Sequence, residues 1–318
     1  TRGGRGPDGR GPHCNLGERA VMRFSIIVAT KDRAAYLDRA IESFGKQIGA
    51  PDFELIVVDN GSTDATPQVV ERARKEQPFE ITYAYEERPN RGAARNRGIS
   101  VAAGHIVIFC DDDIFAPPGF LSAHETAHYS SNFVVSGPIL NVPSYHERPK
   151  PGLANFSRAF LCTCNVSVPL AALKAVKGFD EQFNLYGWED TELGVRLREH
   201  GLRAKFAWDA YLWHIKPPQD VTLESELEKS LEKAKMAVRF VSKNPSGRAL
   251  MATGAYRANL MRARVLGPLL PLYAGLATDE RVPATLRALA RNRLLDGIYT
   301  QELARGLRRD ADPRHGGR

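Results

Sequence analysis

Three consecutive carboxylates, Asp111, Asp112 and Asp113, carry the clearest chemical signal in the sequence. They follow an apolar, β-branched run over 105–110, which predicts a buried strand. Adjacent carboxylates repel one another and lose hydration when they are partly buried. A divalent cation removes that penalty, and Mg²⁺ and Mn²⁺ bind carboxylates together with substrate phosphates. A solvated acidic turn is the alternative, but the apolar run favours a metal site.

A second acidic pair, Glu189 and Asp190, follows Trp188 at the start of a predicted helix over 189–199. Acidic residues in a first turn commonly serve only as partners of the helix dipole. A catalytic role requires one of them to take a proton from a bound hydroxyl group. Trp188 would then offer a flat apolar surface to a sugar ring. For His214 two interpretations remain open: it is a ligand, or it is simply a polar residue at the end of a strand.

Two further segments have both a functional and a structural interpretation. Arg91 and Arg95 open a predicted helix, whose free N–H groups and dipole suit an anion. A solvated basic face explains the same residues, and this segment alone does not separate the two. Asp59 ends the buried run over 53–58, where a turn or helix-capping aspartate is also common.

The elements that position these residues follow from the hydrophobic pattern. Buried runs over 24–29, 53–58, 81–85 and 105–110 alternate with helical patterns over 37–48, 66–75 and 91–103. This alternation predicts right-handed βαβ units and an α/β fold with a mostly parallel sheet. Ligands bind beyond the carboxyl ends of such strands. We therefore expect the segments 30–33, 59–64 and 111–113 to lie together.

The remaining pattern divides the chain into three parts. Six prolines over 115–152 predict loops and irregular strands, and a final strand is expected over 206–213. Leucines at near-helical spacing from Val221 onwards predict a helical tail. We expect a disordered or vector-derived segment over 1–23, an α/β domain over 24–218 and a helical extension over 219–318.

Composition and charge exclude several classes of protein. The chain has 318 residues, of which 43% are hydrophobic and 25% charged, so collagen-like, coiled-coil and wholly disordered proteins are excluded. The net charge is +3 over 1–23, −3 over 24–219 and +7 over 220–318. The excess positive charge therefore lies in the tail.

The same composition leads to an expected location. Four cysteines without CxxC or zinc-site spacing predict a reducing compartment. No apolar run reaches the roughly 18–20 residues of a membrane helix, and no signal peptide is visible. We expect a cytoplasmic protein whose basic tail attaches to the inner face of an anionic membrane. A helical cap or a dimer contact is the alternative role for the tail.

Taken in order, the motifs resemble those of the family 2 glycosyltransferases, which are nucleotide-sugar enzymes of GT-A fold. The resemblance covers about residues 24–216, and its specificity comes from the ordered set rather than from any one motif. The matching segments are 25–33, 54–64, 90–98, 111–117, 165–169, 178–181, 188–193 and His214. The Gly-Trp-Glu-Asp stretch over 187–190 also resembles the acceptor motif in the C-terminal half of galactosyltransferases.

The resemblance implies a metal-dependent, inverting enzyme of polysaccharide biosynthesis or a related pathway. It would move a sugar from a nucleoside diphosphate sugar, with a UDP-sugar favoured, to a hydroxyl group of a glycan, lipid-linked or small-molecule acceptor. Asp190 is implied as the general base, with Glu189 orienting the acceptor. The implied nucleotide-sugar ligands are Thr30, Asp32, Arg33, Asp59, Arg95, Asp111 and Trp188. The implied ligands of Mn²⁺ or Mg²⁺ are Asp112, Asp113 and His214.

One departure from the family pattern leaves the metal ligands open. The commonest spacing is an acid, any residue and an acid, whereas three acids follow Cys110 here. Which two of the three aspartates contact the metal is therefore not fixed by the sequence.

Three other functions are alternatives to glycosyl transfer. A sugar-1-phosphate nucleotidyltransferase would carry a glycine-rich phosphate loop after the first strand, and the segment 29–33 has no glycine. A non-catalytic sugar- or lipid-binding module would not need both acidic clusters. A nucleic-acid binder is suggested only by the charge of the tail, which lacks interleaved aromatic residues. We therefore expect no nucleic-acid partner.

Overall fold

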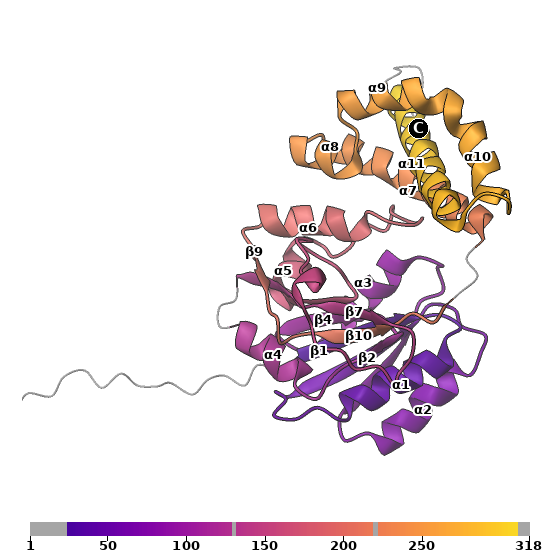
Figure 1. The fold of residues 1–318 in the computed structure, drawn as a ribbon. Helices are drawn as coiled ribbons and strands as arrows, with labels where there is room; N and C mark the ends of the chain where they lie inside the picture. The colour runs from indigo at the N-terminus through magenta and orange to yellow at the C-terminus, as the bar shows by residue number, and fades with distance from the viewer. Residues whose placement is uncertain (1–23, 129–131, 219–221, 311–318) are drawn as a thin grey trace, which may run out of the picture.

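A computed structural model of the chain describes residues 24–128, 132–218 and 222–310 (Figure 1). Its centre is a seven-stranded sheet with the order β3-β2-β1-β4-β8-β6-β9. These strands are β1 (Phe24–Thr30), β2 (Phe53–Asp59), β3 (Glu80–Tyr85), β4 (Ile106–Cys110), β6 (Phe133–Ser136), β8 (Asn165–Pro169) and β9 (Arg203–Phe206). Strands β3, β2, β1 and β4 are parallel, whereas β8 runs antiparallel to both its neighbours. The predicted mostly parallel sheet is confirmed.

Helices cover both faces of the sheet, which explains why its central strands are apolar throughout. One face packs against α1 (Ala34–Phe44), α2 (Thr66–Glu76) and α4 (Phe120–Ala127). The other packs against α3 (Arg91–Val101), α5 (Leu170–Ala175) and α6 (Glu189–Glu199). Ile26 and Ile27 of β1 point to opposite faces and belong to the two separate cores.

A small second sheet of three strands accompanies the large one. It has the order β5-β10-β7 and consists of β5 (Ile114–Phe115), β7 (Ile139–Val142) and β10 (Leu212–Ile215). Strand β5 begins one residue after the aspartate triplet, and β10 pairs with it through His214 opposite Ile114. This pairing brings His214 to the triplet from about a hundred residues away in the chain. A 3₁₀ turn, η1 (Leu153–Asn155), lies in the segment that follows β7.

Two local predictions were wrong. The single strand expected over 206–213 is two strands, β9 and β10, separated by a turn in which Ala210 donates to the carbonyl of Ala207. The proline-rich segment over 115–152 contains α4, because Pro117 and Pro118 precede that helix and do not interrupt it.

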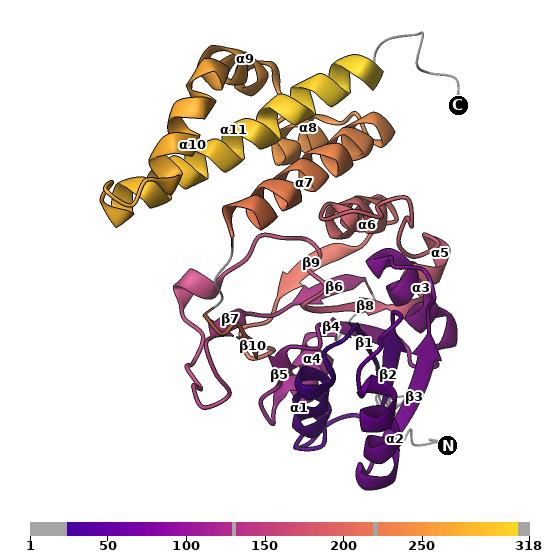
Figure 2. The same cartoon turned by 90° about the vertical axis from the view of Figure 1, so that its right-hand side faces the viewer.

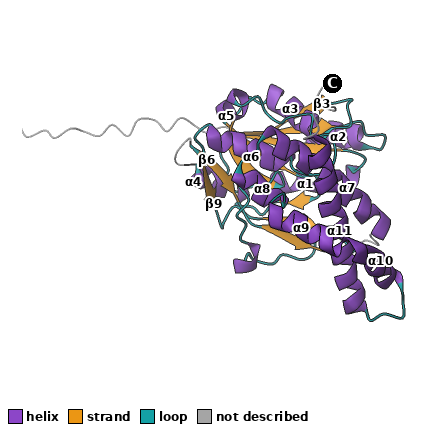
Figure 3. Ribbon diagram, turned by 90° about the horizontal axis from the view of Figure 1, so that it is seen from above, coloured by secondary structure: helices purple, strands orange, loops and turns teal. Residues whose placement is uncertain are grey.

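The helical extension predicted for the tail is confirmed. It consists of α7 (Leu223–Lys243), α8 (Gly247–Thr253), α9 (Arg257–Leu266), η2 (Gly267–Leu269), α10 (Leu270–Thr278) and α11 (Ala284–Asp310). Helix α11 crosses the extension against α7 (Figure 2), and residues of both helices, with Ala255 between α8 and α9, form one core. Seen from above, α10 and the adjoining end of α11 project beyond the edge of the sheet (Figure 3). No helix in the described residues has the length and apolar character to cross a membrane.

The extension joins the sheet domain through α7 and the start of α6. Phe240 stacks on Trp188, with ring centroids 5.9 Å apart, and Lys243 forms a 3.2 Å ion pair with Glu192. Phe183 and Met236 complete a small shared core. The domain boundary predicted at 218 stays a prediction, since packing is continuous across it. The segment 1–23 lies outside the described residues.

Candidate active site

A cavity of about 850 Å³ opens at the carboxyl ends of β1 and β4. Ten of the predicted site residues line it, from five separate stretches of the chain. They are Thr30, Arg33, Arg95, Asp111, Asp112, Asp113, Trp188, Glu189, Asp190 and His214. The fold therefore gathers nearly all of the predicted residues around one space.

Asp112 is buried and both of its oxygens are engaged. Thr30 donates to Asp112 Oδ2 at 2.7 Å, and Arg33 Nη1 lies 3.0 Å from Asp112 Oδ1. Burial raises the pKa of Asp112 to about 6, because the attraction of Arg33 and the bond from Thr30 offset only part of the lost hydration. This carboxylate ties the end of β1 to the end of β4.

Asp113 is also buried, but its pKa is shifted in the opposite direction from that of Asp112. Its Oδ2 atom lies 2.9 Å from both Arg33 Nη2 and Lys216 Nζ. Burial raises the pKa of Asp113, but His214, Lys216 and Arg33 outweigh burial and hold that pKa below its ordinary value. Asp113 is therefore ionised at neutral pH.

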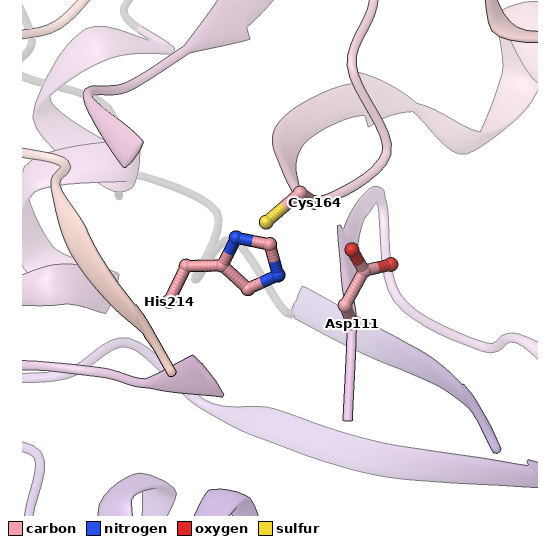
Figure 4. A group of neighbouring side chains, drawn as sticks. All are labelled: Asp111, Cys164 and His214. Carbon is pink, nitrogen blue, oxygen red and sulfur yellow. The ribbon is translucent and has the colours of Figure 1, made fainter. Parts of the chain in front are cut away.

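His214, Asp111 and Cys164 form a group suited to a metal ion (Figure 4). One ligand atom from each lies within 4.8 Å of the others. His214 Nδ1 donates to Asn141 Oδ1 at 2.9 Å, so Nε2 faces Asp113, where it either carries a second proton or presents a lone pair to a cation. Nε2 is buried without a hydrogen-bond partner among the described residues and lies 3.0 Å from Asp113 Oδ1. Two acceptor atoms this close repel each other unless a proton or a cation lies between them.

Arg95 stands between the two acidic clusters. Its Nη atoms lie 3.9 Å from Asp111 Oδ1, 3.6 Å from Glu189 Oε1 and 3.8 Å from Asp190 Oδ1. These distances exceed hydrogen-bond length, and Nη1 is buried without a partner among the described residues. The guanidinium lies over the ring of Phe179, 5.5 Å from its centroid. Arg95 thus presents a free donor to an anion in the cavity.

Glu189 and Asp190 open α6 after a left-handed turn. Gly187 and Trp188 have φ of +92° and +73°, a conformation that costs the tryptophan energy and directs the start of the helix at the cavity. Thr163 holds Asp190 in place, donating to Oδ2 from its backbone N–H at 2.9 Å and from its hydroxyl at 3.0 Å. Burial raises the pKa of Asp190 to about 6 against the attraction of Arg95. Asp190 is therefore largely ionised above neutral pH.

Asp32 and Asp59 do not line the cavity. Asp59 is buried and accepts from the N–H of Ser62 and the hydroxyl of Tyr83, each at 2.7 Å. Asp32 accepts from the N–H of Thr63 at 2.6 Å, and its own N–H donates to Ser62. Both aspartates brace the loops after β1 and β2. Their roles as nucleotide ligands stay predictions.

Several residues of the cavity wall were missed by sequence reasoning. They include Thr163, Cys164, Lys216 and Lys233. Cys110 pairs with Asn165 in the antiparallel register of β4 and β8, which sets Cys164 opposite Asp111. Antiparallel pairing with a distant strand leaves no local pattern, so no sequence signal marks Cys164. Lys216 directly follows the strand that carries His214, and that position was a usable signal.

Two family models match overlapping parts of the chain. The model described as glycosyl transferase family 2 matches residues 25–161, and that of the N-terminal domain of galactosyltransferase matches residues 143–216. Together they span the sheet domain and every residue discussed above except Lys233 and the other residues of the extension.

Two of the curated relatives are glucosyltransferases. Validoxylamine A glucosyltransferase of Streptomyces hygroscopicus subsp. limoneus is 29% identical over 268 residues, which are 71% of this chain and 58% of that protein. A GalNAc(5)-diNAcBac-PP-undecaprenol β-1,3-glucosyltransferase of Campylobacter jejuni is 32% identical over 190 residues, covering 54% of this chain and 58% of its own. The chain thus spans about three fifths of the length of these relatives.

Solved structures show the same fold. Mannosyltransferase PcManGT of Pyrobaculum calidifontis, solved with GDP-Man and Mn²⁺, superposes with a TM-score of 0.63 over 92% of this chain and 88% of its own, at 18% identity. Staphylococcus aureus TarS 1–349 with UDP-GlcNAc gives 0.52 over 89% and 90%, at 22% identity. The fold is GT-A, and the sheet domain is similar in sequence to the family 2 glycosyltransferases over residues 25–161.

Proposed function

We propose that the protein transfers a sugar, with inversion, from a nucleoside diphosphate sugar to an acceptor hydroxyl group. The observation that carries this proposal is the arrangement of one cavity. An aspartate triplet with a candidate metal group lines one side, and an ionisable carboxylate pair lines the other, with Arg95 between them. A UDP-sugar is our favoured donor: TarS 1–349 was solved with UDP-GlcNAc, whereas PcManGT was solved with GDP-Man, so both nucleotide classes enter the test below.

Asp190 is the proposed general base. Its pKa near 6 leaves it ionised at neutral pH and able to take the proton of an acceptor hydroxyl. Thr163 fixes the carboxylate through two donors, so the basic oxygen keeps one orientation. Arg95, whose Nη1 is unsatisfied, offsets the negative charge that grows on the leaving diphosphate. A base opposite the leaving group gives a single displacement and inverts the anomeric centre.

A divalent cation fits the candidate metal group. Asp111 and His214 supply an oxygen and a nitrogen ligand, and the clash between His214 Nε2 and Asp113 Oδ1 is one that a cation relieves. Asp112, predicted as a ligand, has both oxygens engaged by Thr30 and Arg33, so we assign it to positioning. Mn²⁺ or Mg²⁺ bound here would stabilise charge on the diphosphate.

The acceptor is proposed as a class only. Relatives act on acceptors as different as validoxylamine A, poly(ribitol phosphate) and an undecaprenol-linked glycan. The proposal therefore covers a glycan, a lipid-linked acceptor or a small molecule.

Donor hydrolysis tests this function without an acceptor. UDP-, GDP- and dTDP-sugars are added with and without Mn²⁺, thermal shift reports binding, and proton NMR reports the sugar first released by water. We expect one nucleotide class to stabilise the protein in a Mn²⁺-dependent way, and an α-linked donor to release the β-anomer first. Release of the α-anomer first would contradict inversion, and no stabilisation by any donor would contradict the function.

We further propose that the extension attaches the protein peripherally to the inner face of an anionic membrane. Met261, Val265, Leu269, Leu272 and Leu276 are between 36% and 75% exposed, which is unusual for large apolar side chains on neighbouring helices. The extension is also the basic part of the chain. Apolar side chains beside arginines suit an interface of anionic lipids.

Vesicle binding tests the attachment. The protein should sediment with phosphatidylglycerol vesicles at low salt, and raising the salt should weaken binding because it screens the arginines. Met261→Ser with Val265→Ser should weaken it at every salt concentration. If the protein does not bind these vesicles and elutes as a dimer, the exposed apolar side chains of the extension would instead form a contact between copies of this chain.

A further inference from the structure

A second cavity, of about 830 Å³, lies inside the helical extension. Its walls come from α7, α8, α9, α10 and α11, which are far apart in sequence along the tail. Of the residues that line this second cavity, the proposed donor chemistry uses only Trp188. A space of this size is in the range of sites that hold small ligands.

The two cavities meet at Trp188 and Lys233, which line both. The indole of Trp188 is fixed there, since Nε1 donates to the carbonyl of Lys233 at 2.9 Å and the ring stacks on Phe240. Trp188 directly precedes Glu189 and Asp190 in the chain. A molecule held in the second cavity therefore reaches the border of the donor cavity beside the proposed base.

Charge in the second cavity favours an anion. Lys233, Arg262 and Arg293 line it, against the single carboxylate of Asp296. None of the three cations has an ion-pair partner within the part of the chain that the structure describes. Unpaired cations around a concave surface raise the local concentration of anions.

The remaining wall suits a hydroxylated molecule. Tyr256 and Tyr273 contribute aromatic rings, and Ser230 and Thr300 contribute hydroxyl groups. Aromatic rings pack against the apolar faces of ligands, while a few polar groups fix their orientation. Together, the rings, hydroxyl groups and cations match a polyol or sugar that carries an anionic group.

We propose that this cavity binds the acceptor, and that the acceptor is a sugar or polyol bearing a phosphate group. The arginines hold the phosphate, and Trp188 marks where the acceptor hydroxyl enters the donor cavity. This inference rests on the proposed glycosyl transfer for the acceptor role, but binding in the second cavity can be measured without any transfer.

Binding of glucose 6-phosphate and of glucose, measured by saturation-transfer NMR, tests the proposal. We expect glucose 6-phosphate to bind and glucose to bind at least ten-fold more weakly. The double variant Arg262→Ala with Arg293→Ala should bind glucose 6-phosphate no more tightly than glucose. Arg264→Ala, on the same helix but outside the cavity, is the matched control and should bind as the wild type does. UDP binding, measured in parallel, should be unchanged in all variants.

Vesicles separate a soluble acceptor from a lipid-borne one. Phosphatidylinositol carries a polyol phosphate, whereas phosphatidylglycerol at equal content carries the same charge without the ring. A preference for phosphatidylinositol that the double variant abolishes would show a lipid-borne acceptor, and glucose 6-phosphate binding without that preference would show a soluble one. The proposal is overturned if UDP displaces glucose 6-phosphate, or if the double variant binds both phosphate probes normally. If the wild type does not bind UDP, that result would contradict the proposed donor site and not the proposed acceptor site.

Discussion

Two buried histidines form a hydrogen-bonded chain behind the strand that follows Cys164. Asn165 donates through Nδ2 to two backbone carbonyls, so its Oδ1 accepts from His124 Nε2 at 3.1 Å. His124 Nδ1 then accepts from the Ser167 hydroxyl at 2.8 Å, and Ser167 accepts from His128 Nε2 at 2.6 Å. Each link fixes the tautomer of the next, and the chain needs a neutral His124, because a proton on its Nδ1 would remove the acceptor of the Ser167 hydroxyl.

Burial lowers the pKa of His124 to about 4 and that of His128 to about 3. Both histidines take up protons in the unfolded chain near pH 6.5, so their contribution to stability is complete above that pH and is lost as the pH falls toward 4. Between pH 6 and 5 the two histidines should lower the unfolding free energy by up to about 2.7 kcal/mol per pH unit, which is two protons, while Asp112 and Asp190, whose pKa is raised to about 6, act in the opposite direction.

Urea unfolding at several pH values measures this slope. His128→Gln should be less stable than the wild type at pH 7. It should lose about half of the pH dependence that the two histidines contribute to the unfolding free energy, since one titrating group is gone. His105→Gln, at an exposed position, is the control and should keep the wild-type slope. Equal slopes in the wild type and His128→Gln would contradict the neutral chain.

Helix α3 illustrates how close packing positions a site residue. Gly98 faces β1, and a Cβ atom there would stand 2.6 Å from Ile27 Cγ2 and 3.2 Å from Val58 Cγ2. The missing side chain lets α3 lie against the sheet, with Arg95 one turn earlier in the cavity. Asn90 caps the helix by accepting from the N–H of Ala93 at 3.0 Å.

Gly98→Ala should therefore destabilise the protein by about 1–3 kcal/mol, because a crowded core must shift. Gly275 in α10 is the matched helical glycine, with open space around its Cβ position. Gly275→Ala should stabilise by roughly 0.5–1 kcal/mol through helix propensity. Thermal and urea unfolding of the two variants measure the difference, and equal effects of the same sign would contradict the packing of α3.

The sequence predicted the elements that are contiguous and strongly patterned. The four apolar runs became β1, β2, β3 and β4, and the polar segments after β1 and β4 line one cavity because parallel strands end at one edge. Cys164 and Thr163 could not be predicted, because they reach the site through an antiparallel partner from a distant stretch. The split between β9 and β10 depends on tertiary pairing with β6 and β7, which a one-dimensional pattern does not contain.

The sheet domain and the extension are mechanically linked at the start of α6. Phe240 is 1% exposed and packs on Trp188, whose backbone carries the turn into Glu189 and Asp190. Lys243 adds an ion pair to Glu192 on the same helix. The extension therefore supports the turn that aims the proposed base.

Phe240→Ala should lower the unfolding free energy by about 3–5 kcal/mol, the usual cost of emptying a buried aromatic site. It should also reduce turnover more than donor affinity, because the donor side of the cavity belongs to the sheet domain. Leu231→Ala, on the exposed side of α7, is the control and should change both by little. Normal stability and turnover in Phe240→Ala would show that the two parts are independent.

The role of Asp190 is tested most directly by Asp190→Asn, which keeps the size of the side chain and removes the proton acceptor. Donor affinity is measured by calorimetry and turnover by released nucleotide, with Asp209→Asn on an exposed turn as the control. Donor affinity should stay close to that of the wild type, and turnover should fall by roughly 10²–10⁴-fold, the contribution of a positioned general base. Turnover near the wild-type value in Asp190→Asn would contradict the account and move the base elsewhere in the cavity.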